Sequence, residues 1–94
     1  MGRSALRRPL IAGNWKMNLT CAQGKGLADE LKSALRGVTD REIAVFPTFV
    51  SLTDLARQLD GSNIRVGAQN CSHESDGALT GEVSASIVRS TGAS

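Results

Sequence analysis

The sequence predicts an α/β fold in which three parallel strands alternate with three helices. Short apolar runs begin near residues 10, 42 and 64, and each is followed by a stretch whose apolar residues have helical spacing. Alternation of this kind implies a parallel sheet with right-handed crossovers. The length of 94 residues suits one small domain, which we place at residues 9–94, after a basic tail at residues 1–8.

Capping and breaker residues set the boundaries between these elements. The segment at residues 18–20 offers capping side chains for the first helix, Pro47 ends the second strand, and Gly92 stops the last helix. The continuous apolar run that precedes Pro47 is typical of a strand covered on both faces. The strands are expected at about residues 10–16, 42–46 and 64–68, and the helices at about residues 20–36, 51–59 and 82–90.

The first strand ends in polar side chains. Alternate residues of a strand share a face, so Asn14 and Lys16 should point one way, and Trp15 and Met17 the other, where they would pack against helices. An amide beside a cation at the carboxyl end of a strand suits an anionic, oxygen-rich ligand. Ordinary turn chemistry and a solvated strand end explain the same pair, so spacing alone leaves both interpretations open.

Composition excludes several classes of partner. The net charge is +2, with 11 Lys and Arg against 9 Asp and Glu, which is too small to indicate a nucleic-acid surface. No apolar run approaches the roughly 20 residues of a membrane span. The two cysteines, Cys21 and Cys71, lack metal-binding spacing and are expected to be reduced thiols. Since the cysteines lack metal-binding spacing and no signal peptide precedes the first strand, we expect a cytoplasmic protein without a metal.

Four motifs follow one another along the chain: GNWKMN at residues 13–18, FPT at 46–48, GAQNC at 67–71 and GALTGEVSA at 77–85. Together they resemble the motifs of the triosephosphate isomerase family. The resemblance covers about residues 9–94 and implies a TIM (β/α)8 barrel, which typically needs about 250 residues. We therefore interpret the chain as an amino-terminal (βα)3 fragment of that barrel.

The resemblance implies isomerisation of dihydroxyacetone phosphate and glyceraldehyde 3-phosphate through an enediolate, without a cofactor. It assigns Asn14 and Lys16 to substrate binding, with Lys16 catalytic only as a fixed positive charge. The family's catalytic histidine and glutamate follow its fourth and sixth strands, so we expect the 94 residues alone to be inactive. His73 does not match that histidine and is expected to be an exposed loop residue.

A polar loop of about twelve residues follows the third strand, which is long for a mere connector. The resemblance places this loop at a subunit interface, where Thr80 would support the partner's counterparts of Asn14 and Lys16, and where Glu82 would not be the catalytic base. The implied interface residues are Gln69, Asn70, Cys71, Thr80, Gly81 and Glu82.

The sequence leaves two further functions open. Three strands leave two sheet edges, and such edges invite pairing with another copy, so the chain could be a self-associating (βα)3 module. It could also bind anions weakly through Asn14 and Lys16 without catalysis. We expect a homo-oligomer that binds neither nucleic acid nor membranes.

Overall fold

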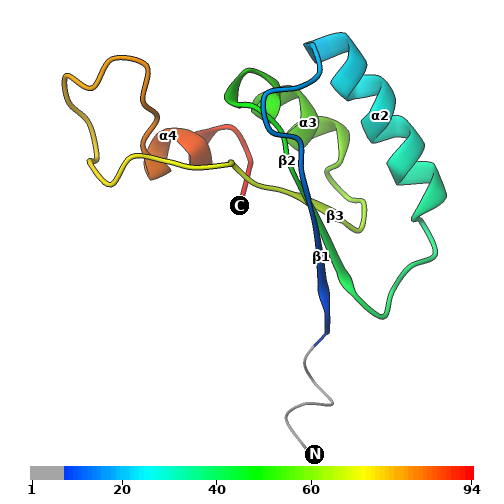
Figure 1. Cartoon of the computed structure of the whole chain (residues 1–94). Coiled ribbons are helices and arrows are strands. Elements are labelled where there is room, and N and C mark those ends of the chain that lie inside the picture. The colour runs from blue at the N-terminus through cyan, green and yellow to red at the C-terminus, as the bar shows by residue number, and fades with distance from the viewer. Residues whose placement is uncertain (1–7) are drawn as a thin grey trace, which may run out of the picture.

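A computed structural model describes residues 8–94, and Arg3 and Arg7 of the predicted basic tail lie outside the described residues. Three parallel strands form one sheet in the order β1-β2-β3 (Figure 1). The alternation of strands and helices confirms the predicted fold class. The elements are β1 (Leu10–Asn14), α2 (Cys21–Ala34), β2 (Glu42–Phe46), the 3-10 turn η1 (Phe49–Ser51), α3 (Leu52–Gln58), β3 (Ile64–Val66) and α4 (Ala85–Ser90).

The core lies between the sheet and the pair of helices α2 and α3. Ile43 and Val45 of β2 are buried beside Ile64 and Val66 of β3, because alternate residues of both strands face the same layer. The helices contribute fully buried apolar side chains to this layer, and Val88 extends it toward α4. The fully buried apolar side chains from α2 and α3 are Ala28, Leu52 and Leu55.

The start of α2 carries a complete capping box. The Thr20 hydroxyl accepts a hydrogen bond from the Gln23 backbone N–H at 3.2 Å, and the Gln23 side-chain oxygen accepts one from the Thr20 N–H at 3.0 Å. Gly24, within the first turns, is buried against Trp15. A Cβ at Gly24 would lie 3.2 Å from the Trp15 ring, so the glycine lets this ring approach the helix closely.

The first strand is shorter than predicted, and its alternation stops early. β1 ends at Asn14, since Lys16 adopts φ +54° and Leu19 φ +76°, which turns the chain out of the strand direction. Trp15 packs against the core, as expected. Met17 is 91% exposed, so the prediction that it packs against helices is wrong. Lys16 lies between Trp15 and Met17, and its left-handed backbone breaks the strand alternation that would have placed both side chains on one face.

The third strand and the last helix also differ from their predicted bounds. β3 ends at Val66, although the Gly67 N–H still donates to the Val45 carbonyl at 3.0 Å. The helix α4 begins at Ala85 rather than near residue 82, because the Ser84 hydroxyl caps it by accepting the Ile87 N–H at 3.2 Å. Residue 83 instead closes the neck of the preceding loop, where its carbonyl accepts the Ser72 N–H at 2.7 Å.

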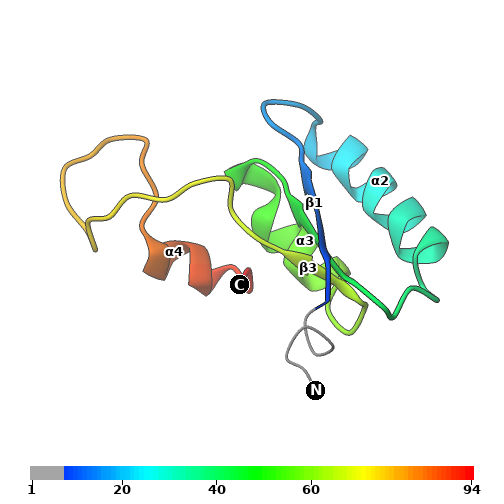
Figure 2. The same ribbon diagram turned by 60° about the horizontal axis from the view of Figure 1, so that its bottom comes forward.

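The third loop, residues 69–83, projects away from the sheet in both ribbon views (Figures 1 and 2). Its residues 73–82 are all exposed. The parallel bridge between Ser72 and Ser84 holds the two arms of this loop together at its base. The loop projects because this pairing at residues 72 and 84 joins its two arms at the base.

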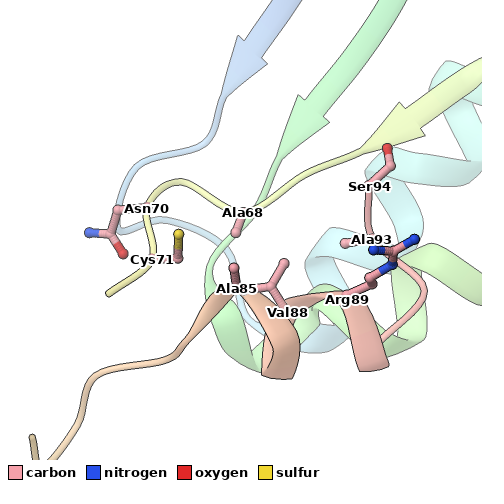
Figure 3. Close-up of a pocket in the computed structure, with 8 residues that line it drawn as sticks. All are labelled: Ala68, Asn70, Cys71, Ala85, Val88, Arg89, Ala93 and Ser94. Atoms are coloured by element: carbon pink, nitrogen blue, oxygen red, sulfur yellow. The ribbon is translucent and has the colours of Figure 1, made fainter. Parts of the chain in front are cut away.

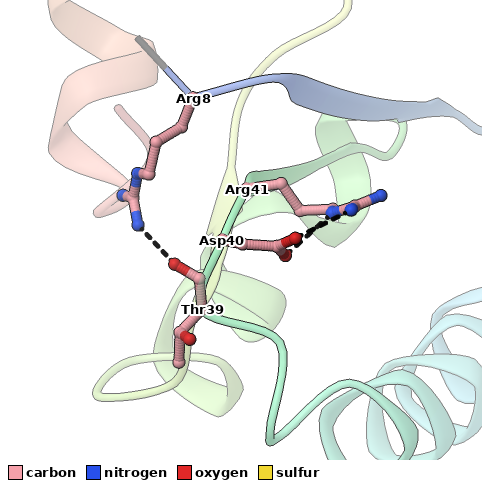
Figure 4. Close-up of polar contacts among 4 residues, drawn as sticks. All are labelled: Arg8, Thr39, Asp40 and Arg41. Carbon is pink, nitrogen blue, oxygen red and sulfur yellow. Dashed lines mark hydrogen bonds and ion pairs between the residues drawn. The ribbon is translucent and has the colours of Figure 1, made fainter. Parts of the chain in front are cut away.

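Charged residues gather just before the first residue of β2 (Figure 4). This end of the sheet is opposite to its carboxyl edge. Arg8 donates a hydrogen bond to the Thr39 carbonyl at 2.9 Å, and Arg41 donates two to the Asp40 carboxylate at 2.9 and 3.0 Å. The hydrogen-bonded Arg41 guanidinium holds the pKa of the Asp40 carboxyl below its usual value. Both partners are exposed, so this pair adds little to stability.

Candidate functional site

Loops from all three strands meet at the carboxyl edge of the sheet. They surround a hollow of about 230 Å³, whose lining comes from the loop after β1, the β2–η1 segment and the start of the third loop. In parallel α/β proteins this edge is where ligands bind. The lining residues are Lys16, Met17, Thr48, Phe49, Gln69 and Asn70.

Asn14 and Lys16 are brought together, although not as neighbours on one strand face. The Asn14 side-chain oxygen accepts a hydrogen bond from the Lys16 backbone N–H at 2.9 Å. This bond turns the chain back on itself and lets Lys16 take its positive φ. The Asn18 side chain donates to the Trp15 carbonyl at 2.9 Å and supports the same turn. Lys16 is exposed at the rim of the hollow.

Gln69 joins this turn from a position 53 residues further along the chain. Its amide nitrogen donates to the Lys16 carbonyl at 2.7 Å and to the Phe46 carbonyl at 2.9 Å. The family resemblance implied only an interface position for Gln69. The carboxyl ends of parallel strands lie side by side. A long amide side chain just after the third predicted strand could therefore have indicated a contact with the ends of the first two strands.

The other predicted interface residues divide into two groups. Asn70 and Cys71 lie near the sheet, while Thr80, Gly81 and Glu82 lie in the projecting third loop and do not line the hollow beside Lys16. All five are exposed. The histidine of this loop, His73, is also exposed and lies 3.2 Å from the Glu74 carboxylate, which confirms the expectation of an exposed loop histidine.

A second, larger hollow of about 580 Å³ lies between the start of the third loop, α4 and the last residues (Figure 3). Asn70 and Cys71 border it on one side and Arg89 on the other, and small apolar side chains make up much of the rest. This lining lacks the convergent polar groups that fix the orientation of a charged small molecule. The hollow beside Lys16 is therefore the better candidate for an anionic ligand.

The chemistry of the Lys16 hollow is that of charge stabilisation. It offers one ammonium group, the Asn70 side-chain amide and the Thr48 hydroxyl, all suited to anionic oxygen atoms, whereas the Gln69 amide nitrogen already donates to two carbonyls. Within residues 8–94, no carboxylate or imidazole lines it, so it contains no strong proton acceptor. The described part of the chain also contains no group of three or more His, Cys, Asp or Glu arranged to hold a metal ion.

Comparisons of the sequence and of the structure with known proteins find the same family. The chain is 49% identical over 87 residues to the triosephosphate isomerase of Syntrophotalea carbinolica, which covers 93% of this chain and 34% of that protein. It is 46% identical over 89 residues to that of Endomicrobium trichonymphae, covering 95% of this chain and 36% of the relative. The crystal structure of the Bartonella henselae triosephosphate isomerase matches 94% of this chain and 36% of its own, with a TM-score of 0.86 at 34% identity.

The chain thus spans about a third of the length of the curated relatives that it matches. In the part of the chain that the structure describes, no helix is both long enough and apolar enough to cross a membrane. The family model described as "Triosephosphate isomerase" matches residues 9–94, nearly the whole sequence. On this match and on the shared fold, the chain belongs to the triosephosphate isomerase family.

Proposed function

We propose that this chain supplies the amino-terminal, anion-binding part of a triosephosphate isomerase active site. The substrate is a triose phosphate, interconverted between dihydroxyacetone phosphate and glyceraldehyde 3-phosphate in glycolysis and gluconeogenesis, and the protein acts in the cytoplasm. The supporting observation is the position of Lys16 at the carboxyl edge of the sheet, where it lines the hollow. Its backbone N–H is bonded to Asn14 and its backbone carbonyl to Gln69, so the cationic residue is held in place.

Lys16 acts in this proposal as a fixed positive charge. The substrate phosphate and the enediolate intermediate are both anionic, so a cation positioned in advance stabilises the transition state without moving during the reaction. Asn14 contributes by setting the turn, because its side-chain oxygen already accepts the Lys16 N–H at 2.9 Å. No cofactor enters this scheme.

Isomerisation also requires a group that moves a proton between two carbon atoms. A general base typically contributes about 10²–10⁴ in rate, and the lining of the Lys16 hollow within residues 8–94 includes no carboxylate or imidazole. We therefore propose that the 94 residues alone do not turn over triose phosphate.

A hybrid protein tests both parts of the proposal. Residues 9–94 replace the matching stretch of the Syntrophotalea carbinolica relative, whose remaining length supplies the rest of the barrel. We expect the hybrid to isomerise glyceraldehyde 3-phosphate, while the purified 94-residue chain stays at the level of a blank without enzyme. An inactive but folded hybrid would count against the proposed function, and turnover by the isolated chain would refute the missing-base argument.

We also propose that the chain associates with further copies of itself through its sheet edges and third loop. Within residues 8–94, β1 lies at one edge of the sheet, and its Ile11 side chain is 51% exposed. Leu79, in the third loop, is half exposed as well. Unpaired backbone groups at an edge, together with exposed apolar side chains, favour pairing with a second copy.

Light scattering at micromolar concentration measures this association. We expect a mass above that of the monomer, and a lower mass for the double variant Ile11→Lys/Leu79→Lys, because charges on an edge strand and loop oppose pairing. Val50→Lys is the matched control, since Val50 is 76% exposed and lies outside the sheet and the third loop. A monomeric mass for the unaltered chain would contradict self-association.

A further inference from the structure

We propose that Gln69 is a positioning residue that holds Lys16 in its left-handed backbone conformation. Its side-chain amide nitrogen donates to the Lys16 carbonyl at 2.7 Å, the shorter of its two hydrogen bonds. Gln69 thus acts on the cation through the backbone, without contacting the ammonium group. The importance of Lys16 for activity rests on the proposed function, whereas its backbone conformation can be measured independently.

Lys16 needs such support because its conformation is unfavourable. A residue with a Cβ is sterically disfavoured in the left-handed region, and lysine has no side-chain acceptor that could stabilise this conformation locally. Residues in such conformations persist only where the surroundings over-determine them. The Lys16 N–H is held by Asn14, but this single bond leaves the following peptide free to rotate. Gln69 holds the carbonyl of that peptide.

The same amide also fixes the turn relative to the sheet. The Phe46 carbonyl, at the end of β2, accepts the Trp15 N–H at 3.1 Å and the Gln69 amide at 2.9 Å. Gln69 itself follows β3 closely, so its two bonds connect the segment after β3 to the segment after β1 and to the last residue of β2. The ammonium group of Lys16 is therefore positioned by the third βα unit, although it belongs to the first.

Gln69→Met tests this role in the full 94-residue chain. Methionine has a similar length but cannot donate a hydrogen bond, and it introduces no charge beside Lys16. Asn70→Leu is the matched control, because Asn70 is the next amide and its side chain makes no hydrogen bond within residues 8–94. NMR spectroscopy reports the Lys16 backbone through its three-bond HN–Hα coupling and its Cα and Cβ chemical shifts.

We expect the left-handed signature of Lys16 in the unaltered chain and in Asn70→Leu, and its loss in Gln69→Met. Retention of the signature in Gln69→Met would overturn the proposal. If that variant does not give a dispersed spectrum, the kcat/KM of the hybrid protein tests the proposal instead, because the remainder of the barrel supports the fold there.

The hybrid separates a positioning role from a merely structural one. We expect Gln69→Met to lower kcat/KM by about 10²-fold, the usual effect of misplacing an active-site group by about 1 Å. The double variant Lys16→Ala/Gln69→Met should be no worse than Lys16→Ala alone, because Gln69 acts through Lys16. Additive losses, or full activity of Gln69→Met, would refute the positioning role. Full activity of Lys16→Ala would instead refute the proposed function. The NMR measurement would then be the test of whether Gln69 holds the Lys16 backbone.

Discussion

Lys16→Ala is expected to lower kcat/KM of the hybrid enzyme by about 10²–10³-fold, the cost of removing one preorganised group that stabilises developing negative charge. The substitution removes the only ammonium group that lines the hollow at the carboxyl edge within residues 8–94. Steady-state kinetics with glyceraldehyde 3-phosphate measures the change. A loss shared by kcat and kcat/KM indicates stabilisation of the transition state, while a loss in KM alone indicates binding of the phosphate in the ground state.

Lys25→Ala is the matched control for this experiment. Lys25 lies on α2, is exposed and does not line the Lys16 hollow, so its removal changes the net charge equally without changing the site. Its kcat/KM should stay close to that of the unaltered hybrid. Equal losses in the two variants would mean that overall charge, and not the position of Lys16, determines the rate.

Leu55→Ala is expected to lower the free energy of unfolding of the 94-residue chain by about 2–5 kcal/mol. Leu55 is fully buried at the centre of the layer between α3 and the sheet, so its removal leaves a cavity that the neighbours cannot fill completely. A small domain has only about 5–15 kcal/mol of stability in total. The variant should therefore lose a large share of its folded population.

Urea denaturation followed by tryptophan fluorescence measures this loss, because Trp15 is the single tryptophan and packs against the core. Thr53→Ala provides the control, since Thr53 is exposed on the same helix, two residues before Leu55. Its midpoint should stay close to that of the unaltered chain. Equal midpoints for Leu55→Ala and Thr53→Ala would show that the described core does not stabilise the chain.

The order and type of the elements were predictable because their signals are local. Apolar runs marked the strands, and the capping side chains at residues 18–20 marked the start of α2, which begins at Cys21 against a predicted start near residue 20. The start of α4 was predicted too early. Its cap depends on Ser84, which is held at the neck of the third loop by pairing with Ser72, twelve residues before it, and such pairing leaves no periodic pattern in the sequence.

The sequence by itself determined the parallel (βα)3 architecture, the family, and the presence of Asn14 and Lys16 at the end of the first strand. Only the tertiary structure decided how these two residues are arranged. The positive φ of Lys16, the exposure of Met17 and the contact with Gln69 all depend on strand ends meeting in space. Periodicity and capping act over a few residues, whereas the Gln69–Lys16 hydrogen bond joins positions 53 residues apart, which only the assembled sheet brings within bonding distance.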